Sequence, residues 1–300
     1  MSEHHHHHHE VSGKNLFITI VLNIIITASQ IIGGILSGSL ALLSDALHNF
    51  SDVLALVIAY VANRLSTYPS SEVKTFGYKR AEILATLFNS SVLVGVGIFL
   101  IVEAIKKFLH PEVIDSNLVI WLGVLSIVLN SASVLLIKDD SHDNMNIKAA
   151  YLHLLTDVMT SVAVVLGGVL MHFFDIFWID PLISILIAIY LIWASFGLVK
   201  DSSAILMQFS PKDIDIQKVI DTIKTQKEIE NLHHIHIWKL DDKNIHLEAH
   251  LDFKDDLPIS LSNKVLDNLE EILQKEFHIS HTTFQCEYKR DDDKSVIYQR

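Results

Sequence analysis

Residues 45–52 read DALHNFSD and residues 153–157 read HLLTD, and in both stretches a His precedes an Asp by four positions. Four residues is about one helical turn, so the His and the Asp of each stretch share one helix face. Two helices that turn these faces together present two imidazoles and two carboxylates, a ligand set suited to zinc or a related divalent metal. The pattern predicts a divalent-metal site formed by His48, Asp52, His153 and Asp157.

The composition places these stretches in a membrane protein that also has a soluble part. The chain has 300 residues, of which 50% are hydrophobic and 19% charged, and its mean hydropathy is +0.36. The net charge of -12 is spread over both halves, which argues against nucleic acid as a partner. The single cysteine, Cys286, permits no internal disulfide and favours a reducing compartment for the C-terminal half.

Six apolar stretches are near or above the roughly 20 residues that a helix needs to cross a bilayer. We expect them at 16–36, 40–65, 81–109, 118–137, 147–174 and 179–199, within a transmembrane domain at 14–208. Basic residues gather in the second link (Arg64, Lys74, Lys79 and Arg80) and bound the fourth (Lys138 and Lys148). The first and fifth links have none, so the positive-inside rule predicts both termini in the cytoplasm.

The first 13 residues form a His-rich arm, with six consecutive histidines at positions 4–9. Such a run is either a purification tag or a native arm that collects metal, and the sequence leaves both readings open.

Beyond position 208 the pattern becomes that of a soluble domain, at 209–290. Apolar residues recur at helical spacing over 213–226 and 260–276, and they alternate with polar residues in the strand expected at 244–253. Further strands are expected at 231–240 and 282–288. The order αββαβ predicts a two-layer α+β domain with the helices on one face of a three-stranded sheet, followed by a frayed tail at 291–300.

An ionised Asp at the centre of a spanning helix costs about 2.5–3.5 kcal/mol on insertion scales, so buried carboxylates need a cation, water or a polar partner. One alternative to a metal site is a cluster of His–Asp hydrogen bonds that packs the helices together. The repetition of one spacing in two helices favours the metal site. Asp45 lies two turns before Asp52, and we expect it to line the transport path, to support a metal-bound His or to sit at the membrane interface.

These ligands also suit transport. Imidazole and carboxylate bind zinc well, and the six apolar stretches contain no thiolate that would retain it. Metal binding requires neutral imidazoles, so protons and metal compete for the site. A site that is open to each side of the membrane in turn would therefore exchange metal for protons.

A second metal site is predicted in the soluble domain, at His233, His250 and Glu287. His233 begins one strand, His250 lies late in the next, and Glu287 lies near the end of the third. We expect antiparallel pairing to bring the three together as a regulatory zinc site. Surface histidines without a function remain the alternative for each one taken singly.

Four motifs together resemble the cation diffusion facilitators, a family of zinc transporters. They are SLALLSDALH at 39–48 followed by Asp52, FGYKRAE at 76–82, HHIHIW at 233–238 and FQCE at 284–287, and the resemblance covers the chain after the His run. His153 and Asp157 fall where that family has its other two transport ligands. The resemblance implies a homodimeric efflux transporter for zinc, often with cadmium or cobalt, driven by inward proton flow. It also implies a ferredoxin-like cytoplasmic domain.

The sequence departs from the family pattern at three places. Residues 64–80 contain neither His nor Asp, so the additional metal site of some relatives is not expected there. The link 138–148 is short and has only His142, which is similar to bacterial exporters of the inner membrane. Gln285 stands where some members have a His, and Glu287 is therefore the ligand expected at that strand.

Two other functions compete with transport. A zinc enzyme within the membrane is disfavoured, because the chain has no His-Glu-x-x-His motif and no obvious nucleophile paired with a general base. We therefore expect neither an enzyme nor a resident cofactor. A membrane-bound metal sensor that signals through the His-rich soluble domain is the second alternative.

Overall fold

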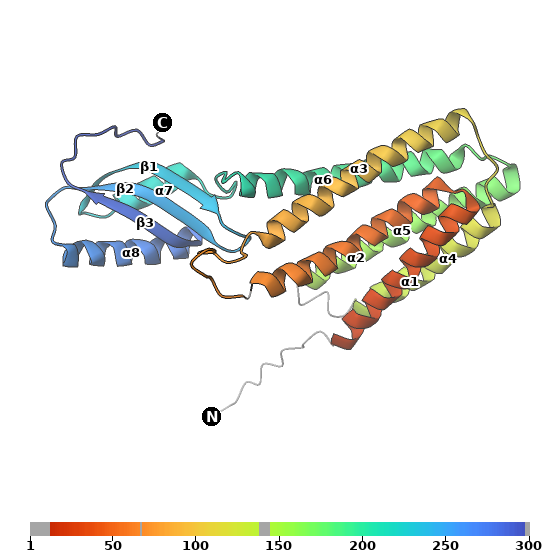
Figure 1. The fold of residues 1–300 in the computed structure, drawn as a ribbon, viewed down its shortest axis with the longest axis horizontal. Coiled ribbons are helices and arrows are strands. Elements are labelled where there is room, and N and C mark those ends of the chain that lie inside the picture. Colours follow the sequence, from red (N-terminus) through yellow and green to blue (C-terminus); the bar gives the residue numbers. More distant parts are fainter. Residues whose placement is uncertain (1–12, 67, 138–144, 298–300) are drawn as a thin grey trace, which may run out of the picture. The chain divides into compact units, whose positions relative to one another are not determined.

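The computed structural model describes residues 13–66, 68–137 and 145–297 (Figure 1). The His-rich arm up to residue 12 and most of the fourth link, including His142, lie outside the described residues. The chain divides into two compact units. One contains the chain up to Tyr60 together with Phe88–Leu198, and the other contains Val61–Leu87 and the chain from Val199 onward.

Six long helices correspond to the six predicted apolar stretches. They are α1 (Gly13–Ser37), α2 (Leu40–Ser66), α3 (Ala81–Leu109), α4 (Ser116–Ile137), α5 (Met145–Phe174) and α6 (Ile179–Leu206). Among the described residues, four helices are long and apolar enough to cross a membrane, and these lie in α3, α4, α5 and α6. In α1, the apolar part Val21–Ser37 is shorter. Helix α6 extends seven residues beyond the predicted end at 199, through polar residues that a hydropathy criterion excludes.

The turn between α1 and α2 is held by side chains from distant helices. Gly38 has a φ of 72°, a left-handed conformation that glycine adopts without steric cost. The Asp180 carboxyl of α6 accepts hydrogen bonds from Ser39 Oγ (2.5 Å) and from the backbone N of Leu40 (2.7 Å). Lys107 of α3 donates to the Gly38 carbonyl (2.6 Å). These bonds fix the first turn of α2, the helix that bears His48.

Helices α4 and α5 approach closely, because Gly123 has no side chain. A Cβ at Gly123 would lie only 2.5 Å from Val165 Cγ2 of α5. Buried side chains of α2, α4, α5 and α6 form one hydrophobic cluster, which includes Leu42, Val119, Val164, Met171 and Ile187. The cluster places α2 and α5 in the same packed bundle.

The C-terminal domain has the predicted order of elements: α7 (Ile216–Lys224), β1 (Ile229–Lys239), β2 (Ile245–Phe253), α8 (Ile259–Phe277) and β3 (Ile279–Glu287). The strand order is β1-β2-β3 (Figure 1). Alternate residues of the strands form one hydrophobic core with both helices, as expected for two layers. At the predicted hairpin turn, the Asp241 carboxyl accepts from the backbone N of Lys243 (2.9 Å) and of Asn244 (2.8 Å).

Two expectations for this domain need correction. β1 and β2 pair antiparallel, as expected, but β2 and β3 pair parallel. The reason is that α8 returns the chain to the end of the sheet where β2 begins, so β3 runs in the same direction as β2. The tail is also not frayed from residue 291. The backbone N of His234 donates to Ser295 O (3.2 Å), and that of Ile235 donates to Val296 O (2.9 Å), so the described tail runs along β1.

Candidate metal centres

The structure brings together the four residues with the repeated spacing. His48 and Asp52 lie on α2, and His153 and Asp157 lie on α5. Each imidazole approaches the carboxylate of the opposite helix: His48 Nε2 lies 3.4 Å from Asp157 Oδ1, and His153 Nε2 lies 3.1 Å from Asp52 Oδ2. One ligand atom from each of the four residues can be chosen so that all lie within 4.8 Å of one another. A divalent cation fits this spacing with modest side-chain movement.

Polar atoms of this cluster lack hydrogen-bond partners. His48 Nε2, Asp52 Oδ2 and Asp157 Oδ1 are buried and make no hydrogen bond. The side chain of Asp157 is 4% exposed, and that of His153 is 41% exposed. Buried polar atoms without partners are costly, and a bound cation would satisfy all three. The lack of partners favours a cation site over a cluster that only packs the helices together.

Asp45 lies next to this cluster but has different partners. It is fully buried and accepts hydrogen bonds from Gln30 Nε2 (2.5 Å), Thr160 Oγ1 (2.9 Å) and Ser161 Oγ (3.1 Å). Gln30 in turn accepts from Asn49 Nδ2 (2.9 Å). This network links α1, α2 and α5 and holds Asp45 in the interior of the helical unit.

Two residues of α6 that contact α2 were not singled out from the sequence. The ring of Tyr190 on α6 meets the His48 ring edge-on, with centroids 6.1 Å apart. Asp180, described above, caps α2 from a position 140 residues away in the chain. No local sequence pattern predicts either contact, because both depend on how α6 packs against α2.

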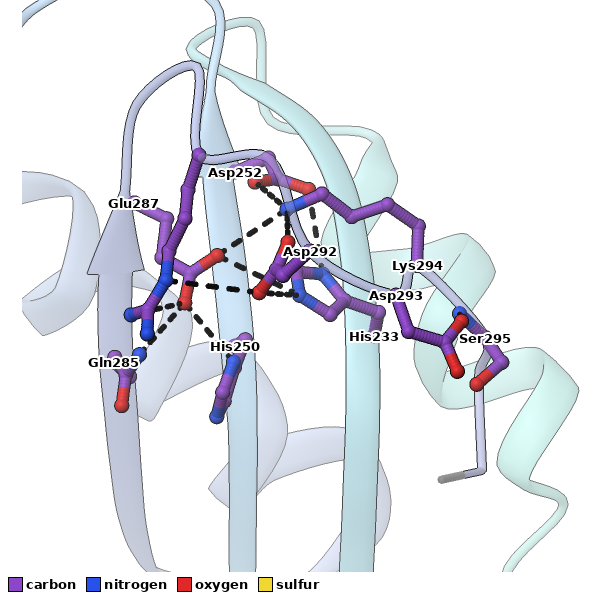
Figure 2. A network of polar contacts seen from close by, with 10 residues as sticks. His233, His250, Asp252, Gln285, Glu287, Asp292, Asp293, Lys294 and Ser295 are labelled. Carbon is purple, nitrogen blue, oxygen red and sulfur yellow. Dashed lines mark hydrogen bonds and ion pairs between the residues drawn. The ribbon is translucent and has the colours of Figure 1, made fainter. Parts of the chain in front are cut away.

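The second predicted cluster lies where the three strands carry polar residues side by side. His233 of β1 pairs with His250 of β2, and Asp252 of β2 pairs with Glu287 of β3. His250 Nδ1 lies 3.0 Å from Glu287 Oε1, and His233 Nε2 lies 3.5 Å from Glu287 Oε2 (Figure 2). His233 is fully buried, and neither of its ring nitrogens has a hydrogen-bond partner.

The tail after β3 contributes to this cluster, which was not predicted from the sequence. Asp292 Oδ2 lies 3.5 Å from His233 Nε2, and Asp292 belongs with His233, His250 and Glu287 to a group whose ligand atoms lie within 4.8 Å of one another. A hydrogen bond from Lys294 lowers the pKa of Asp292 to about 2. Burial disfavours the charged amine of Lys294, but hydrogen bonds to Asp252, Asp292 and Glu287 outweigh it and raise the pKa of Lys294. The acidic run 291–293 gave no sign of this role in the sequence.

Two consecutive parts of the chain match known family models. Residues 16–207 match the family model described as the cation efflux transmembrane domain. Residues 211–289 match the model described as the cation efflux protein, cytoplasmic domain. The first match ends at residue 207 and the second begins at residue 211.

Curated relatives are similar over nearly the whole chain. A protein of Bacillus subtilis named cadmium, cobalt and zinc/H(+)-K(+) antiporter is 36% identical, covering 96% of this chain and 94% of its own. The cation efflux system protein CzcD of an Alcaligenes species is 32% identical, with 91% and 86% covered. The zinc transporter ZitB of Pectobacterium atrosepticum is 31% identical, with 96% and 90% covered.

Proposed function

The chain belongs to the cation efflux family, the cation diffusion facilitators, and from this premise we propose that it exports zinc in exchange for protons. The family consists of integral membrane transporters, and this chain has a helical membrane domain followed by a cytoplasmic domain with a small sheet. The observation that carries the proposal is the cluster of His48, Asp52, His153 and Asp157, with its buried and unpartnered nitrogen and oxygen atoms. In this proposal zinc is the substrate of that cluster.

The chemistry of the four side chains gives the exchange its driving force. His48 and His153 bind zinc only when an Nε2 lone pair is free, so protonation of either ring weakens binding. The Asp52 and Asp157 carboxylates lie within 3.8 Å of both rings and hold either zinc or the imidazolium protons that replace it. Alternating access would then load zinc where protons are scarce and release it where they are abundant.

The choice of zinc rests on the donors and on the names of the relatives. Two imidazoles and two carboxylates suit zinc, whereas cadmium favours softer ligands. Two of the relatives named above are described as carrying zinc, one of them together with cadmium and cobalt, and the third is described as a cation efflux protein. We propose zinc as the principal substrate, with cadmium and cobalt as weaker ones.

The assembly proposed around this site has six membrane-spanning helices, α1 to α6, with both termini in the cytoplasm of a bacterial inner membrane. The basic residues of the second link support this orientation. The cytoplasmic domain, with its αββαβ order, is proposed to be ferredoxin-like and to mediate homodimerisation. His233, His250 and Glu287 are proposed to bind a regulatory zinc ion there.

A zinc sensor without transport is the second candidate, since the cluster of His233, His250 and Glu287 offers a metal site in the domain where a signal would arise. A sensor would bind zinc in the cytoplasmic domain and carry none across the membrane. Flux therefore separates the two functions.

The experiment is zinc uptake into proteoliposomes that have an acidic interior and contain a zinc-sensitive dye. We expect uptake that depends on the proton gradient, slows when a protonophore collapses it and continues when potassium is left out. Protein-free vesicles are the control. Zinc binding to the protein without gradient-dependent uptake would contradict the transport proposal and favour the sensor.

A further inference from the structure

The tail docks on the open edge of the sheet at a break in strand pairing. β1 is an edge strand, and its register with β2 shifts between His233 and His236. Such a bulge leaves backbone groups without partners in the neighbouring strand. The backbone N–H groups of His234 and Ile235 instead bond the carbonyls of Ser295 and Val296. This docking carries Asp292 and Lys294 over the cluster of His233, His250 and Glu287 (Figure 2).

The amine of Lys294 lies among carboxylates that a metal ion would also need. Lys294 Nζ is 2.8 Å from Asp252 Oδ1 and 3.2 Å from Glu287 Oε2, and it contacts Asp292 Oδ1 as well. Two of these carboxylates, those of Glu287 and Asp292, belong to the four-residue metal-ligand group. The Lys294 ammonium therefore supplies positive charge that these acidic groups require in the absence of metal, together with the Arg290 guanidinium, which lies 3.1 Å from Glu287 Oε1.

The ammonium does not satisfy the imidazoles of the cluster. Lysine has donors only, so it offers nothing to a ring nitrogen lone pair. Both nitrogens of His233 and Nδ1 of His250 are buried without a hydrogen-bond partner, although carboxylate oxygens lie 3.0–3.5 Å from them. A divalent cation would satisfy imidazoles and carboxylates together, and it would repel an ammonium group in contact with the same oxygens.

We propose that Lys294 is a built-in competitor of zinc at the cytoplasmic cluster, and that Asp292 of the same tail is a zinc ligand. Zinc binding displaces the Lys294 amine from Glu287 and Asp252 while Asp292 keeps the tail attached. The tail thus sets the zinc concentration at which the cluster fills. This inference rests on the regulatory zinc site proposed above, but it does not depend on transport.

The test is zinc titration of the full-length protein in detergent against a competing chelator, in an Asp157→Ala background that weakens zinc binding at the transport cluster. We expect Lys294→Gln to tighten zinc binding about tenfold, and Asp292→Asn to weaken it by about tenfold or more. Lys289→Gln is the matched control. It removes the same charge from a lysine five residues earlier, whose amine lies 5.0 Å from the centroid of the Tyr288 ring. We expect this control to change zinc affinity little.

Opposite effects of two residues on one tail separate competition from a structural role. If the tail only stabilised the sheet, both variants would weaken binding. Unchanged or weaker binding by Lys294→Gln, or no zinc binding by the cytoplasmic domain at all, would overturn the proposal. If both variants change zinc affinity as expected but the protein shows no zinc flux in proteoliposomes, only the proposed transport function would be overturned.

A second measurement uses the unmutated residues and so does not depend on how the variants fold. Amine acetylation of Lys294, followed by mass spectrometry, should be slow without zinc and at least severalfold faster once zinc is added, with Lys289 unchanged as the internal reference. Acetylation of Lys294 that zinc leaves unaltered would mean that the amine is not displaced.

Discussion

Proton-driven zinc uptake should fall by more than about 100-fold when Asp157 is replaced by alanine, because the substitution removes one of only four metal ligands. Asp157 is nearly fully buried, and its two oxygens lie 3.4 Å and 3.8 Å from the Nε2 atoms of His48 and His153. Without this carboxylate the cluster retains three ligands and loses half of its negative charge. The measurement is the initial rate of zinc uptake into proteoliposomes under a fixed proton gradient.

The control for Asp157→Ala is Glu103→Gln, which also removes a carboxylate from a membrane helix. Glu103 pairs with Lys106 at 2.6 Å near the end of α3, away from the cluster, and we expect this variant to transport zinc at the unmodified rate. The melting temperature of Asp157→Ala should stay the same or rise, since Asp157 Oδ1 is a buried oxygen without a hydrogen bond. Undiminished uptake by a folded Asp157→Ala protein would exclude Asp157 as a transport ligand.

In contrast to Asp157→Ala, replacing Asp180 by alanine should destabilise the fold, by about 2–4 kcal/mol. Its carboxyl accepts hydrogen bonds from Ser39 Oγ and from the backbone N–H groups of Leu40 and Ala41, all in a buried environment. Alanine would leave these donors without partners at the first turn of α2. We expect a lower melting temperature and a lower yield of monodisperse protein.

Asp115→Ala serves as the comparison for Asp180→Ala. Asp115 also accepts from a helix N-terminus, through the backbone N of Leu118 (3.1 Å), but this bond is exposed. Loss of an exposed cap costs about 1 kcal/mol. If Asp115→Ala lowered the melting temperature as much as Asp180→Ala does, burial would not be the source of the Asp180 effect.

The contrast between Asp157 and Asp180 distinguishes a site from a support. Both are buried acids in the helical unit. Asp180 has a donor for each of its oxygens, whereas Asp157 faces imidazoles at distances that leave Oδ1 without a hydrogen bond. A buried polar group without a hydrogen-bond partner lowers the stability of the fold, and such a loss is common at functional sites. Burial alone would not separate the two roles; the completeness of hydrogen bonding does.

Much of the fold, and the composition of the transport cluster, could be predicted from the local sequence. The apolar length of each stretch predicts its helix, and the bounds of α3 match the prediction at both ends. The spacing of four residues from His48 to Asp52 fixes a shared face for any helix that contains them. The local sequence does not show that α2 and α5 face each other. The contact between His48 of α2 and Asp157 of α5 shows this arrangement.

The missed features all depend on contacts between distant segments. The local sequence around Asp180 indicates only the start of a helix, whereas its hydrogen-bond partner Leu40 lies 140 residues earlier in the chain. The sequence pattern of β3 is compatible with either direction of pairing, and only the length of α8 favours the parallel one. The charged tail 291–294 has the composition of a frayed end, yet the bulge at His234 and Ile235 provides the backbone donors that hold it.

The most direct test of the transport cluster is anomalous scattering at the zinc absorption edge, from crystals of the full-length protein grown with zinc. We predict a peak bounded by His48, Asp52, His153 and Asp157, with ligand atoms at about 2.0–2.2 Å from the zinc ion. A helical unit that holds its zinc elsewhere, or that leaves these four side chains without metal while the protein transports zinc, would contradict this prediction.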